Sequence, residues 1–155
     1  MISISKVVEK LGIPVDYSPA TEAVWDGKRM HLSHVKCNEE GYTFYHLSDE
    51  DFFHEVAHYL LCAPDRAAQK DFGFLWSPHF LTFYGADRHQ VTPASHEDEE
   101  FAASILQICM MQYCGLEVPE IEYPHMAACE WFARGMNHPR MQESWELFCM
   151  MMEGE

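Results

Sequence analysis

Ser48-Asp-Glu-Asp-Phe-Phe-His-Glu-Val-Ala-His-Tyr-Leu-Leu-Cys62 is the segment from which the rest of the chain can be interpreted. Apolar residues fill most of its second half, and Ser48 is followed three residues later by Asp51, a pairing typical of a helix N-terminus. Pro64 disfavours helical geometry in the residue before it. The sequence therefore predicts a capped and largely buried helix from about residue 49 to residue 62.

This helix contains a His-Glu-x-x-His match, His54-Glu55-Val56-Ala57-His58. A spacing of four residues is about one helical turn, so both imidazoles lie on one face and can bind a common ion. Glu55 flanks that face, where it can reach a water molecule without being a ligand itself. The motif predicts that His54 and His58 bind Zn²⁺ and that Glu55 is the general base of a hydrolase. The alternative is two histidines one turn apart that bind no metal.

A catalytic zinc ion needs a third protein ligand and an open position for water. The extended metzincin motif requires Gly at position 61 and His at position 64, but the chain has Leu61 and Pro64, which excludes that class. No glutamate lies between Glu55 and Glu97, so a closely spaced third glutamate is excluded as well. The third ligand must therefore come from a later segment.

A second long helix is expected from residue 95 to residue 114, and potential ligands crowd its start: His96, Glu97, Asp98, Glu99 and Glu100. Apolar residues at positions 101, 105 and 108 mark its inward face. At about 100° per residue, Glu97 lies near that face, whereas Glu99 and Glu100 project about 120–140° away from its centre. Glu97 is the predicted third ligand, and Glu100, His96 and Asp98 are the alternatives. An acidic run also suits a helix N-terminus without any metal.

A strand-like segment, the H-E-x-x-H helix and a helix with Glu97-Asp-Glu-Glu-Phe-Ala-Ala-Ser-Ile-Leu106 follow one another along the chain. In this order of motifs the chain resembles the ImmA/IrrE-type zinc metallopeptidases between residues 20 and 110. The resemblance implies a zincin-like fold and peptide-bond hydrolysis. It also implies that the glutamate four residues before the Phe-Ala pair, Glu97, is the third zinc ligand.

The remaining patterns predict short strands and further helices. An Asp26-Gly27 turn signal predicts a hairpin over residues 23–32, and residues 42–47 favour another strand. Helical patterns cover residues 4–11, 125–134 and 139–152. We expect one α+β domain over residues 1–155, a zincin-like metallopeptidase domain with a small antiparallel sheet packed on the H-E-x-x-H helix and additional C-terminal helices.

Composition excludes several classes of partner. The 155 residues include 10 basic and 25 acidic ones, so the net charge of −15 argues against a nucleic-acid groove or a polybasic membrane contact. The charged N-terminus and the lack of a long apolar run predict neither a signal peptide nor a membrane helix. The six cysteines form no C-x-x-C pair and are interpreted as mostly buried free thiols. These features together predict a cytoplasmic protein.

Two further features have open interpretations. Aromatic residues between positions 72 and 84 form either core or a substrate pocket, and four side chains there are candidates to stabilise an oxyanion: His79, Tyr84, Arg88 and His89. A C-terminal stripe follows helical spacing and forms either core or a homodimer or partner surface: Met141, Trp145, Phe148 and Met152.

The predicted function is zinc-dependent hydrolysis of a protein or peptide substrate. The alternatives are a catalytically silent zincin-fold binding module and an acidic interaction or inhibitor protein such as a phage encodes.

Overall fold

The computed structural model describes residues 1–20, 24–38, 41–62, 67–68, 72, 76–77, 82–83 and 93–154. In chain order its elements are α1 (Ile4–Leu11), β1 (Val15–Ala20), β2 (Met30–Asn38), β3 (Gly41–His46), α2 (Asp49–Leu61), β4 (Trp76–Ser77), β5 (Thr82–Phe83), α4 (Pro93–Tyr113), α5 (Ala128–Met136) and α6 (Met141–Glu153). This mixture of helices and short strands confirms the α+β class.

The larger sheet has the order β1-β2-β3 and is mixed. β2 and β3 pair antiparallel, but β1 pairs with β2 in parallel, from Val15 opposite Met30 to Ala20 opposite His34. The expectation of an antiparallel sheet is therefore wrong for β1. Local turn signals reveal hairpins, whereas a parallel pair joins segments that no tight turn connects.

The predicted turn at Asp26-Gly27 is present, although it is not part of a full hairpin. The Asp26 carboxylate accepts hydrogen bonds from the backbone N–H groups of Lys28 and Arg29, each at 2.7 Å. Trp25 and Met30 then form an isolated antiparallel bridge. The turn reverses the chain, and β2 takes β1 and β3 as its neighbours.

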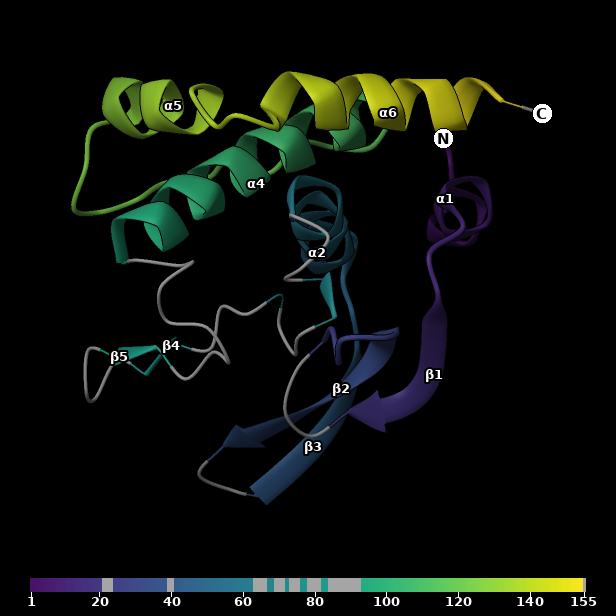
Figure 1. The fold of residues 1–155 in the computed structure, drawn as a ribbon. Coiled ribbons are helices and arrows are strands. Elements are labelled where there is room, and N and C mark those ends of the chain that lie inside the picture. Colours follow the sequence, from purple (N-terminus) through teal and green to yellow (C-terminus); the bar gives the residue numbers. More distant parts are fainter. Residues whose placement is uncertain are drawn as a thin grey trace.

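Helix α2 begins as its sequence predicts. Ser48 accepts a hydrogen bond from the backbone N–H of Asp51 at 3.1 Å, which confirms the cap. Figure 1 shows α2 with the sheet below it, α4 above it, and α5 and α6 covering α4 from the opposite side. α2 and α4 are in extensive contact. The site motif thus lies in the middle of the fold.

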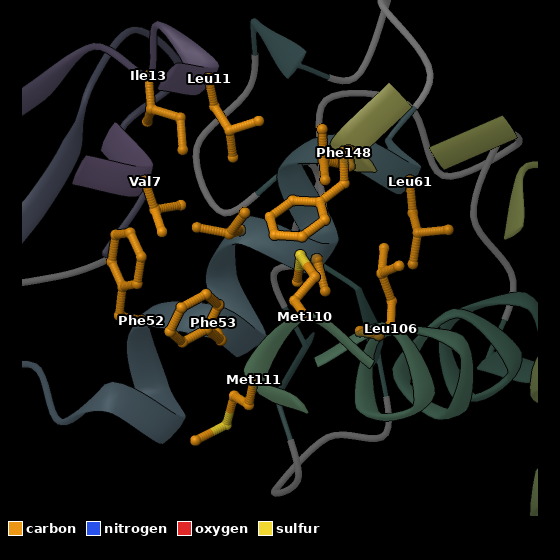
Figure 2. Close-up of a cluster of buried hydrophobic side chains, with 14 of the residues drawn as sticks. Val7, Leu11, Ile13, Phe52, Phe53, Leu61, Leu106, Met110, Met111 and Phe148 are labelled. Atoms are coloured by element: carbon orange, nitrogen blue, oxygen red, sulfur yellow. The ribbon is translucent and has the colours of Figure 1, made fainter. Parts of the chain in front are cut away.

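Side chains from the helices meet in one apolar core (Figure 2). Phe148 of α6 is completely buried and lies among side chains of α1, α2 and α4. Met141 and Met152 of the same helix are also buried. The interpretation of the C-terminal stripe as core is confirmed for these three residues.

Helix α4 is buried on two faces. Gly135 of α5 approaches it so closely that an added Cβ would lie 2.6 Å from Ile105 Cδ1 and 2.8 Å from the backbone carbon of Phe101. The Phe101 ring packs edge-on against Tyr123, with 4.7 Å between ring centroids. The face that carries Phe101 and Ile105 is therefore turned toward α5, while another face of α4 is turned toward α2.

The described part of the chain includes no helix with both the length and the apolar character needed to cross a bilayer. Four described cysteines are free thiols: Cys109, Cys114, Cys129 and Cys149. Cys62 and Cys114 are buried, and Cys129 is exposed.

Candidate metal centre

Two histidines of α2 and one glutamate of α4 converge on a common point. His54, His58 and Glu100 each offer a ligand atom, and these atoms all lie within 4.8 Å of one another. The Nε2 atoms of the two histidines are 3.2 Å apart. Glu100 places Oε1 2.8 Å from Nε2 of His58 and Oε2 3.1 Å from Nε2 of His54. These three residues could hold a metal ion.

The spacing of these atoms agrees with a small tetrahedral site. Zinc–nitrogen and zinc–oxygen bonds of about 2.0 Å place neighbouring tetrahedral ligand atoms about 3.3 Å apart. The two Nε2 atoms, 3.2 Å apart, are close to this value, and each has a different oxygen of the Glu100 carboxylate nearby, at 2.8 Å from His58 and 3.1 Å from His54. Two imidazoles and one carboxylate are also a ligand set of catalytic zinc sites, in which a fourth position stays open.

One side of the centre is closed by aromatic rings. The His58 side chain is 5% exposed, and its ring stacks on Phe72 with 6.0 Å between centroids. Phe72 in turn stacks on Trp25 at 5.2 Å. The side chains of His54 and Glu100 are 25% and 31% exposed, so the centre is reached from their side.

The sequence prediction of Glu97 as third ligand has to be corrected, because this residue does not join the group. Its carboxylate accepts a hydrogen bond from Arg134 of α5 at 2.8 Å. Glu97 lies one turn before Phe101, on the α4 face that is turned toward α5. Glu100 occupies the position that was predicted for Glu97. The error arose because the apolar face of α4 that was taken as inward packs on α5 and not on α2.

The alternatives Asp98 and His96 lie outside the group as well. Asp98 is bound by Arg134 at 2.6 Å. His96 is one turn before Glu100, and burial lowers its pKa although the carboxylates of Glu100 and Glu99 oppose that shift. Among the described residues, the group of convergent ligand atoms comprises His54, His58 and Glu100.

Each histidine has a polar partner on the side of its ring away from the centre. Nδ1 of His54 donates to the Gln107 side-chain oxygen at 3.0 Å. Nδ1 of His58 lies 3.5 Å from a carboxylate oxygen of Glu99. Such partners keep the proton on Nδ1 and leave the Nε2 lone pair for a metal ion.

These outer residues were missed by the sequence analysis, although Gln107 carried a signal. It interrupts an apolar run seven residues after Glu100 and so lies on the same helical face. Glu99 was dismissed as outward-facing, yet it is 3% exposed. His138, which donates to Glu99 at 3.2 Å, has no sequence spacing that relates it to the motif.

Glu55 sits beside the centre with an unsatisfied oxygen. Among the described residues, no group forms a hydrogen bond with its buried Oε2. Burial raises the pKa of Glu55, while the neighbouring His58 and His54 act to lower it. A buried carboxylate oxygen without a partner is costly, and a functional role such as proton transfer is one explanation for its retention.

The ligand group is held together electrostatically when no metal is bound. Burial opposes a charge on His58, but the Glu100 carboxylate outweighs it and holds the pKa of His58 well above its usual range. Burial would raise the pKa of Glu100, but His58 and His54 hold that pKa well below its ordinary value. His58 therefore carries a second ring proton, on the Nε2 atom that faces Glu100. A metal ion must displace this proton to bind Nε2, so metal binding releases a proton.

Most residues of the suggested substrate pocket lie outside the part of the chain that the structure describes. Phe72 is buried and belongs to the wall of the centre. The other aromatic side chains up to position 84, and the four candidates for oxyanion stabilisation at positions 79, 84, 88 and 89, lie outside the residues and side chains that the structure describes.

Comparison of the chain with protein-family models, with curated proteins and with solved structures finds no match. Membership of the ImmA/IrrE-type peptidases therefore stays a prediction from the two helical motifs. Any functional conclusion rests on the side chains of the centre.

Proposed function

We propose that this protein is a zinc-dependent metallopeptidase of zincin-like fold. His54, His58 and Glu100 are its metal ligands, and Glu55 is its general base. The observation that carries the proposal is the convergence of the two H-E-x-x-H imidazoles with a carboxylate of a second helix, beside a buried glutamate oxygen that receives no hydrogen bond from the described residues. Glu100 replaces Glu97 in this assignment.

In this proposal three residues bind the metal ion and one, Glu55, transfers a proton. Once the proton on His58 is displaced, His54 and His58 would present neutral Nε2 atoms to the metal ion, and Glu100 supplies one negative charge close to both. When bound, Zn²⁺ supplies Lewis acidity, which polarises a substrate carbonyl and makes a water molecule more acidic. Glu55 accepts the proton of the attacking water at its carboxylate and donates it to the leaving amine.

Burial supports this role for Glu55. A carboxylate whose pKa is raised by burial accepts a proton more readily than an exposed one, because its charged form is poorly solvated. The aromatic wall at His58 keeps bulk water away from one side of the centre, which strengthens the local electrostatic interactions.

The test compares the wild-type chain with Glu55→Gln on a peptide library, with zinc content measured for both. The substitution conserves size but removes proton acceptance, so zinc is retained and cleavage falls about 10²–10⁴-fold. Equal cleavage by both proteins contradicts the assigned mechanism. Zinc binding without cleavage by either favours the silent zincin-fold binding module. Absence of metal from both favours the acidic interaction protein, which would bind its partner through the net charge of −15.

A further inference from the structure

A line of buried polar side chains leads from His58 through Glu99 to His138, in the connection between α5 and α6. Glu99 lies between His58 and His138, with its two carboxylate oxygens directed at different rings. Oε2 is 3.5 Å from Nδ1 of His58, and Oε1 is 3.2 Å from Nε2 of His138. The exposed fractions of the side chains alone are 5% for His58, 4% for Glu99 and 11% for His138.

The protonation of His138 follows from its second partner. Its Nδ1 accepts a hydrogen bond from the backbone N–H of Arg140 at 3.1 Å. The ring proton is therefore on Nε2, from which it is donated to Glu99. His138 consequently fixes one oxygen of Glu99 and leaves the other for His58.

We propose that Glu99 and His138 are positioning residues of the metal centre. Glu99 holds the proton of His58 on Nδ1 and orients its ring, and His138 holds Glu99. This inference rests on the proposed function, because it assigns a role to residues that act through a proposed metal ligand.

The two histidine ligands then differ in the charge of their outer partners. His54 is held by the neutral amide of Gln107, whereas His58 is held by a buried carboxylate. A carboxylate partner makes an imidazole a stronger electron donor than an amide partner does. We therefore expect the zinc affinity of the centre to depend strongly on Glu99, although Glu99 is not itself a ligand.

The experiment measures zinc affinity of the full chain by competition with a chelating indicator, and records visible absorption of the Co²⁺-loaded protein. Glu99→Gln supplies one acceptor and one donor where two acceptors are needed, so it opposes a donor of one ring. We expect zinc affinity to fall about 10–100-fold and the Co²⁺ bands to shift. Glu97→Gln is the matched control, because it alters an acidic residue of the same helix end that binds Arg134.

A second pair of variants separates positioning from folding. His138→Gln can keep an N–H donor toward Glu99, whereas His138→Leu cannot. His138 also lines a cleft of about 530 Å³ beside Met141 and Trp145, which leaves room for either side chain. We expect His138→Gln to stay within about threefold of wild type and His138→Leu to follow Glu99→Gln.

The outcomes distinguish this inference from the proposed function. A wild-type chain that binds no zinc overturns both. A wild-type chain that binds zinc, with Glu99→Gln at equal affinity, overturns the positioning role and leaves the metal centre standing. Equal losses in the two His138 variants also overturn it, because a donor to Glu99 would then have no effect. Should Glu99→Gln not fold, the His138 pair decides the question.

Discussion

Replacement of the third ligand distinguishes the assignment based on the structure, Glu100, from the assignment based on the sequence, Glu97. Glu100→Ala removes the carboxylate that lies within 2.8 and 3.1 Å of the two histidine Nε2 atoms. Glu97→Ala removes a carboxylate that binds Arg134 instead. The two glutamates are three residues apart on one helix, so each variant is the natural control for the other.

The expected magnitudes differ strongly. Loss of outer partners alone typically weakens metal binding 10–100-fold, so loss of a ligand in Glu100→Ala should cost at least about 100-fold, or about 2.8 kcal/mol. The side chains of Glu97 and Arg134 are 38% and 31% exposed, and Arg134 keeps Asp98 at 2.6 Å. A partly exposed ion pair contributes at most about 1 kcal/mol, so Glu97→Ala should lower Tm by no more than about 4 °C and leave zinc affinity unchanged.

Zinc affinity is measured by chelator competition, and folding of each metal-free variant by thermal unfolding. Unchanged zinc affinity in Glu100→Ala, together with a large loss in Glu97→Ala, would refute the geometry and restore the assignment made from helix phase. A comparable loss in both variants would mean that the α4 register relative to α2 differs from the one described.

Three further predictions concern stability. Gly135→Ala inserts a Cβ against the α4 backbone and should cost about 1–3 kcal/mol in urea unfolding, whereas Ala133→Ser on the exposed side of α5 should have little effect. Ser48→Ala removes the cap of α2 and should cost about 1 kcal/mol. Burial opposes the charge on His31, but its hydrogen bond to Asp26 at 2.8 Å outweighs burial and raises the His31 pKa. This contribution is present below the unfolded pKa of about 6.5 and is lost as pH rises through the folded value, so Asp26→Asn should destabilise more at pH 5.5 than at pH 8.5. An equal effect at both pH values would contradict that assignment.

Local signals predicted the parts of the fold that depend on local sequence. Ser48 and the apolar positions after it specify α2, and the histidine pair follows from helical spacing alone. The parallel pairing of β1 was not predictable, because it depends on contacts between separate segments. Glu100 was assigned to the wrong side because α4 is apolar on two faces, and periodicity cannot tell which face meets α2. His138 reaches Glu99 across 39 positions of the chain, a relation that only the tertiary structure creates.

The central claim is tested most directly by X-ray absorption at the zinc edge of the full chain, after metal analysis of the same sample. The account predicts about one Zn²⁺ per chain, bound by nitrogen and oxygen ligands at about 2.0–2.1 Å with imidazole scattering from two histidines. A chain that takes up no zinc after incubation, or a spectrum dominated by sulfur at about 2.3 Å, would contradict a centre built from His54, His58 and Glu100.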